Sequence, residues 1–204
     1  MAYPTVSAPY GLKPVNSLDG KPYAGQTRLI PVDIGYGTAI FNGDTVLLNA
    51  NGCIVKSTGT DSGGIVGVVV GGQYVNSNGQ TVQGQYYPAA TSTATALAYA
   101  YVVDDPSATF RVAATTAGGT AAVSASRTVV GLNVPIVFGA GSTATGDSAY
   151  GIDISAAATT NTLPIRIVDV IPDTASGPRS ASATTYYEFV VKFNLHEYNY
   201  TTGA

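Results

Sequence analysis

Hydrophobic residues in this chain gather in short runs, rich in valine and isoleucine, that are separated by glycine-containing turns. The run at residues 65–70 is apolar on both faces, which is typical of a central strand. Asn51-Gly52 and Asn78-Gly79 are strong turn signals, and each is followed by a further extended segment. Short strands at this spacing predict an all-β fold made of small barrels or sandwiches.

The extended pattern recurs along the whole chain, and no window has the apolar spacing of a long helix. An alanine-rich segment at 91–101 is the strongest rival for a helix, but its threonines and tyrosines favour a strand. The predicted strands lie within residues 26–32, 41–48, 53–56, 65–70 and 81–87 in the first half, and within 96–103, 109–113, 134–138, 149–154, 163–171 and 186–193 in the second.

Four prolines, with glycines between them, interrupt the N-terminal segment 1–26. Proline removes a backbone donor and biases the preceding residue toward extended geometry, so we expect an extended arm there. A loop-like stretch near residues 88–95 is the expected boundary between two lobes. The prediction is a first β lobe at 27–90 and a second β-rich lobe with a C-terminal tail at 91–204.

Composition narrows the possible functions. Only 10% of the 204 residues are charged and the net charge is −3, which gives no basic footprint for nucleic acid. A hydrophobic content of 45%, with 14 tyrosines, is enough to bury a core and excludes disorder. A single cysteine, Cys53, excludes an intrachain disulfide framework.

The N-terminus begins Met1-Ala2-Tyr3 and has neither the basic nor the apolar region of a signal peptide. The longest apolar run is also too short to span a bilayer. We therefore expect synthesis in a cytoplasm, a soluble chain, and no membrane partner.

Several short motifs resemble catalytic or cofactor sites but lack their partners. The segment 60–64 is similar to the surroundings of a protease serine, Ser62, yet the single histidine, His196, follows it in the chain. The Gly-rich segment 139–144 is followed by more loop residues, whereas a dinucleotide site needs a helix there. Asp104-Asp105 is more typical of a turn or a helical cap than of a metal site. We predict no enzyme activity, no metal and no cofactor.

Tyrosines in the two terminal segments need another explanation, because core aromatics are expected inside strands. Tyrosine buries a large area at low entropic cost and keeps a polar tip, which suits protein interfaces. Alternatively, both termini fold back over the chain's own sheets. The candidate interaction residues are Tyr3, Tyr10, Tyr23, Tyr198 and Tyr200.

Five segments of the chain resemble small structural proteins of marine tailed bacteriophages. They are Ala8-Pro9-Tyr10-Gly11-Leu12-Lys13-Pro14, Phe41-Asn42-Gly43-Asp44-Thr45-Val46, Tyr101-Val102-Val103-Asp104-Asp105-Pro106, Leu163-Pro164-Ile165-Arg166-Ile167-Val168-Asp169, and Val191-Lys192-Phe193-Asn194-Leu195-His196. The Gly-Asp-x-Val strand, followed by Gly-x-Ile-Val and Ile-Val-Gly-Val, is more distantly similar to the β-barrel lobe of phage head-decoration (cement) proteins.

The resemblance implies a non-enzymatic virion protein that binds the outer surface of a capsid and clamps neighbouring major capsid subunits. It implies the major capsid protein as partner, self-association with a trimer favoured, and a location on the capsid exterior after synthesis in the host bacterial cytoplasm. It carries over no active-site residues. An extended arm fits this role, since it adds contact area across a subunit boundary without enlarging the core.

Other functions stay open at this level. A major capsid protein is usually longer and contains a long spine helix that this sequence lacks. A minor head or tail-tube protein is the next alternative. A carbohydrate-binding β-sandwich is a third, with Tyr86-Tyr87 or Tyr186-Tyr187 as stacking residues, although adjacent residues of a strand point to opposite faces.

Overall fold

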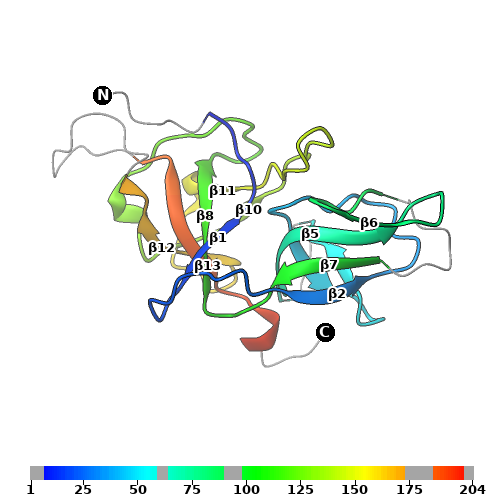
Figure 1. The fold of residues 1–204 in the computed structure, drawn as a ribbon. Helices are drawn as coiled ribbons and strands as arrows, with labels where there is room; N and C mark the ends of the chain where they lie inside the picture. The colour runs from blue at the N-terminus through cyan, green and yellow to red at the C-terminus, as the bar shows by residue number, and fades with distance from the viewer. Residues whose placement is uncertain (1–6, 59–63, 90–97, 173–185, 200–204) are drawn as a thin grey trace.

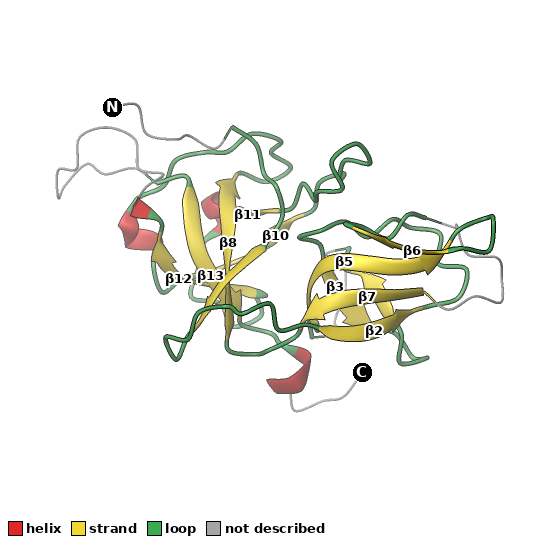
Figure 2. Cartoon of the chain, in the orientation of Figure 1, coloured by secondary structure: helices red, strands yellow, loops and turns green. Residues whose placement is uncertain are grey.

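The computed structural model describes residues 7–58, 64–89, 98–172 and 186–199, and it shows a nearly all-β chain with two sheets (Figure 1). The sheets form two bodies that lie side by side, with short 3-10 helices at the turns (Figure 2). The all-β prediction is therefore confirmed. The 3-10 helices are η1 (Arg127–Val129), η2 (Ile154–Ala156) and η4 (Glu197–Asn199).

The first body is a closed barrel. Its strands are β2 (Arg28–Val32), β3 (Thr45–Leu48), β4 (Ile54–Lys56), β5 (Gly67–Val75), β6 (Thr81–Gly84) and β7 (Ala98–Val103). They follow the order β3-β4-β2-β7-β5-β6, and pairing of β3 with β5 closes the ring, so that β6 lies outside it as an added strand. Closure pairs the backbone groups that an open sheet would leave at its edges.

The second body is a seven-stranded sheet centred on β8 (Ala108–Thr115). Arg111 of β8 pairs with Lys13 on one side and with Val190 on the other, so β8 lies between two antiparallel neighbours. The remaining strands are β1 (Lys13–Ser17), β9 (Asn133–Val134), β10 (Ile136–Val137), β11 (Gly151–Asp153), β12 (Ile165–Val170) and β13 (Glu188–Phe193).

Each body has its own apolar core, and the second core extends onto the barrel. Alternating residues of the barrel strands, such as Val32, Ala100 and Val102, fill the inside of the ring. Leu47 and Val68 belong to barrel strands but pack in the cluster of the second sheet. The two bodies are therefore joined by continuous hydrophobic packing, which favours a fixed relative position.

The division between the sheets differs from the expected boundary near residues 88–95. Strand β7 comes after that boundary but pairs with β2 and β5 of the barrel. The chain leaves the barrel only between Val103 and Ala108. The stretch before β7, rich in alanine, serine and threonine, was an ambiguous signal, because such a composition does not distinguish a boundary between lobes from a connection within one lobe.

The N-terminal arm is extended in part, as expected, and it folds back onto the second sheet. Residues 13–17 form β1, and Leu12 before it is fully buried. Pro14 is tolerated because β1 lies at a border of the sheet, beside β8, and its register shifts between Pro14 and Asn16. The arm thus completes the second sheet, and we expect its removal to destabilise the β fold.

Candidate functional site

The junction between the two bodies begins where two glycines meet. A Cβ on Gly11 would lie 2.6 Å from the Cβ of Ser148 and 2.8 Å from the Cα of Gly43. Both glycines have positive φ, at 84° and 99°, which other residues rarely adopt. The amide of Leu12 donates to the Gly43 carbonyl at 3.0 Å, and that of Gly11 donates to the Tyr150 carbonyl at 2.9 Å. Only glycine allows the arm to approach the barrel this closely.

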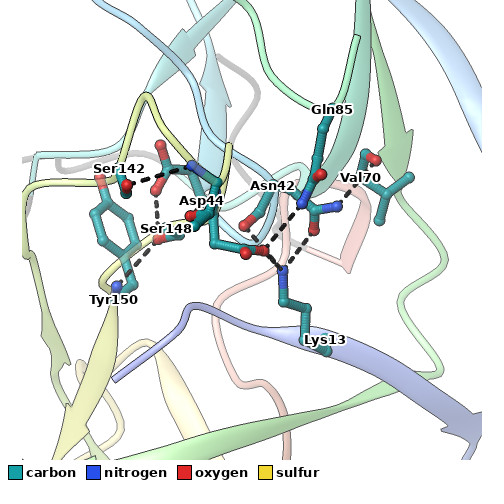
Figure 3. A network of polar contacts seen from close by, with 10 residues as sticks. Lys13, Asn42, Asp44, Val70, Gln85, Ser142, Ser148 and Tyr150 are labelled. Atoms are coloured by element: carbon teal, nitrogen blue, oxygen red, sulfur yellow. Dashed lines mark hydrogen bonds and ion pairs between the residues drawn. The ribbon is translucent and has the colours of Figure 1, made fainter. Parts of the chain in front are cut away.

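A buried ion pair lies beside this crossing. Asp44 is fully buried, and its carboxylate is 2.7 Å from the ammonium of Lys56. It also accepts a hydrogen bond from the hydroxyl of Ser148 at 2.6 Å (Figure 3). The amide of Phe41 donates a further hydrogen bond to it at 2.8 Å. The Lys56 ammonium lies 4.9 Å from the centre of the Tyr150 ring. Because three donors share the carboxylate, its charge is balanced without solvent.

A second, more exposed polar cluster borders the junction. Lys13 of β1 lies 2.7 Å from the Asp147 carboxylate and donates to the side-chain oxygen of Asn42 at 2.8 Å. Gln85 donates to the same Asp147 oxygen at 3.2 Å (Figure 3). Lys13 and Asp147 belong to the second sheet and its loops, whereas Asn42 and Gln85 belong to the barrel side. The cluster therefore links the two bodies through charged and polar groups.

The C-terminal segment crosses back to the barrel at His196. Its backbone lies beside Ile65, whose amide donates to Leu195 and whose carbonyl accepts from Glu197, both at 3.0 Å. The imidazole is 1% exposed, and its Nδ1 accepts from the amide of Tyr198 at 3.2 Å. Burial lowers the pKa of His196, with the nearby Asp104 opposing this effect. This histidine is a structural contact between the two bodies.

Tyr10 lies inside the fold as part of a polar triad. Its hydroxyl donates to the buried carboxylate of Glu188 and accepts from the Arg111 guanidinium at 2.8 Å. Arg111 also forms an ion pair with Glu188 at 2.9 Å. Burial, together with the hydrogen bond to Glu188, raises the pKa of Tyr10 above its usual value. Tyr10 therefore anchors the arm to the second sheet.

The other candidate tyrosines divide into two groups. Tyr23 packs against the second core, and its burial raises its pKa. Tyr198 is 45% exposed, and the guanidinium of Arg28 lies 5.1 Å from its ring centre. Tyr3 and Tyr200 lie outside the described residues. Tyr198 is thus the described member of the set that is most open to a partner.

The remaining motifs have local roles where they are described. Asp104 pairs with Arg28 at 2.7 Å, and Asp105 accepts from the Ser107 amide at 2.8 Å, as expected for a turn. Ser62 lies outside the described residues. Cys53 is half-buried, and burial raises the pKa of its thiol. In the described ranges, no three His, Cys, Asp or Glu side chains lie together as a metal site would need.

Sequence reasoning missed one feature of the barrel surface. Tyr99 and Tyr101 alternate along β7 with Ala98 and Ala100, which are buried inside the barrel. The signal was an alternation of small and aromatic residues with a period of two, which predicts that the aromatic residues face outward.

Comparisons of this chain with known protein families, with curated proteins and with solved structures gave no match. Among the described residues, no helix has the length and apolar character needed to cross a bilayer. The function must therefore be argued from the residues and their geometry.

Proposed function

We propose that this chain is a non-enzymatic structural protein of a tailed bacteriophage, which binds the outer surface of the capsid and stabilises contacts between major capsid subunits. The main support is the position in the fold of the segments that resemble phage proteins. The segment 8–14 crosses the segment 41–46 at Gly11 and Gly43, and the ending 191–196 returns to the barrel at Ile65. Three of the five resembling segments thus lie where the two bodies meet.

A rigid junction suits a clamp. A protein that joins neighbouring capsid subunits must transmit force between its two contact surfaces, so a hinge between its bodies would weaken it. Continuous apolar packing, the hydrogen bond from Ser148 to Asp44 and the hydrogen bond from Lys13 to Asn42 all oppose such a hinge. The geometry therefore supports a role in which the relative position of the two bodies matters.

Low surface charge supports the same role. With 10% charged residues, contacts of this protein depend little on ion pairs that salt would screen. Binding to a repeated lattice also gains avidity when each copy touches two subunits. The proposed partners are the major capsid protein and further copies of this chain, with a trimer favoured.

The described part of the N-terminal arm makes its contacts within the fold, so we look for the capsid contact at other positions. Gly11, Leu12 and Tyr10 are committed to the fold, so contact with the capsid must come from exposed positions. Leu18, in the turn after β1, is 47% exposed, and Tyr198 in η4 is 45% exposed. These two residues are the first candidates for the contact surface.

Cryo-electron microscopy of the assembled particle tests the proposal directly. The expected result is density for both bodies on the outer shell, at contacts between capsid subunits. Density confined to the tail would instead establish the tail-protein alternative. Binding of the purified chain to undecorated shells tests the surface, where Leu18→Asp is expected to lower occupancy. The matched control is Ser77→Asp, which adds the same charge to an exposed turn between β5 and β6.

A further inference from the structure

Strand β7 places small side chains inside the barrel and large aromatic side chains outside it. Ala98 and Ala100, at 3% and 0% exposure, face the core, whereas the larger Tyr99 and Tyr101 are half-buried on the outside. A strand that serves only the core normally places its large apolar residues inward. The two outward rings, two positions apart, therefore lie on the same face and need a role outside the core.

Amide side chains continue the row that begins at Tyr99. Tyr99 pairs with Gln73 of β5, and Gln73 pairs in turn with Gln83 of β6. On the other side, Tyr99 pairs with Pro31 of β2. Residues that pair directly across strands have side chains on the same face, so one ring and two amides follow each other across the sheet.

The neighbouring row contains the second ring. Tyr101 pairs with Leu29, which is 43% exposed, and with Gly71 on the other side. A Cβ on Gly71 would lie 3.5 Å from the Tyr101 ring, so glycine leaves that side of the ring without a covering side chain. In Figure 2 the strands β2, β7, β5 and β6 lie side by side in front of β3, and no other described strand crosses them.

We propose that this tyrosine face, made of Leu29, Pro31, Gln73, Gln83, Tyr99 and Tyr101, binds a neutral polysaccharide. A sugar ring has an apolar face of C–H groups that packs on an aromatic ring, and a rim of hydroxyls. Tyrosine supplies the ring and a polar tip, while glutamine amides supply both donors and acceptors for the hydroxyls. The face interleaves these two kinds of group across adjacent strands.

The tyrosine face has no charged side chains, and this favours a neutral ligand. The strand positions of β2, β5, β6 and β7 that share this face carry no charged side chain. A nucleic acid or an acidic glycan would need cations to replace its counterions. A neutral chain of sugars needs none, and it matches a face whose only polar groups are amides and hydroxyls. This binding is independent of the capsid function, so either can fail alone.

Electrophoresis of the full chain through native gels that contain a dissolved neutral polysaccharide tests the proposal. The net charge of −3 and the sequence pI of about 4.8 drive the protein to the anode at neutral pH, and a neutral polymer changes its mobility only by binding or sieving. The probes are dextran, laminarin, galactomannan and hydroxyethylcellulose, compared with a non-binding protein of similar size. We expect at least one probe to retard the chain.

Variants assign the retardation to the tyrosine face. Tyr99→Ala and Tyr101→Ala are each expected to weaken binding by about tenfold, since each removes one stacking ring. Tyr101→Phe keeps the ring and should retain binding, and the matched control Leu18→Ala, at an exposed site outside the face, should leave it unchanged. An unaltered urea midpoint shows that each variant is folded.

Two results overturn the proposal. One is that no probe retards the wild-type chain. The other is that the alanine variants are retarded as strongly as the wild type. If those same variants also convert an oligomer to a monomer in sedimentation velocity, the face is a contact between copies of this chain.

Discussion

The ion pair between Asp44 and Lys56 lies within the barrel and contacts the second body through Ser148 and Tyr150, so its removal tests the charges buried beside the junction. Lys56→Met keeps most of the side-chain volume and removes the ammonium. Asp44 then retains its hydrogen bonds from Ser148 and from the Phe41 amide but loses its counter-charge. Asp44→Asn removes the opposite charge and leaves Lys56, at 12% side-chain exposure, without its carboxylate.

Burial determines the size of the effect. Removing one partner of a buried ion pair costs about 3–5 kcal/mol, because the other charge stays in a medium of low polarity. We expect about 3 kcal/mol for Lys56→Met, since two of the three hydrogen-bond partners of Asp44 remain. For Asp44→Asn we expect about 4 kcal/mol, partly offset by the Tyr150 ring near the ammonium. The double variant should cost about 2 kcal/mol less than the sum of the single variants.

Urea unfolding followed by tyrosine fluorescence and circular dichroism gives the free energies for this cycle. For a domain of this size, 3 kcal/mol corresponds to a fall in Tm of about 6–12 °C. Lys21→Met is a matched control, because Lys21 also lies 2.7 Å from a carboxylate, that of Asp19, but is 80% exposed. It should leave the urea midpoint unchanged, since exposed pairs contribute little.

The reasoning is refuted if Lys56→Met and Asp44→Asn act additively, because the two charges would then be stabilised independently of each other. It is equally refuted if Lys56→Met leaves the midpoint as unchanged as Lys21→Met does. Two separate unfolding transitions in the wild type would also contradict a firm junction, since bodies joined by one core should unfold together.

Three further predictions follow from the same contacts. Gly11→Ala should destabilise the chain by about 2–4 kcal/mol in urea unfolding, because a Cβ would collide with Ser148 at a positive φ. Burial lowers the pKa of His196 in the folded state, so folding favours the neutral imidazole. The contribution of His196 to the free energy of unfolding is therefore fully present above the unfolded pKa of about 6.5 and is lost as pH falls below that value. The urea midpoint should therefore drop between about pH 8 and about pH 5.5, and His196→Gln should reduce that drop. Tyr10→Phe should cost about 1–3 kcal/mol by thermal unfolding, because the buried Glu188 loses a hydrogen bond.

Local strand formation could be predicted from the sequence, because it depends on patterns within a few residues. Asn51-Gly52 and Asn78-Gly79 turn the chain as expected, and Gly52 and Gly79 have the positive φ that such turns need. The β-branched run that begins at residue 65 became β5, the strand that pairs with three others. These elements follow from backbone preference and alternation alone.

Pairing between distant strands could not be predicted in the same way. Nothing local to residues 13–17 indicates that they pair with β8, and the prolines nearby favour a free arm. The candidate site depends on such distant pairings, since Asp44 meets Ser148 only after the second sheet has formed. The motif Gly43-Asp44 was recognised from its resemblance, but its role as a buried junction required the structure.

The pairing of β1 with β8 has a consequence for synthesis on the ribosome. Lys13 leaves the ribosome long before its partner Arg111, by roughly 5–20 s at ordinary elongation rates. Throughout that interval the first strand, with the apolar Leu12 beside it, lies unpaired while other nascent chains are close. Pro14 removes one backbone donor from this strand, and proline on an exposed edge is one means by which natural proteins prevent pairing with a wrong strand. The same proline that makes β1 hard to predict thereby lowers the risk of wrong pairing before β8 has been made.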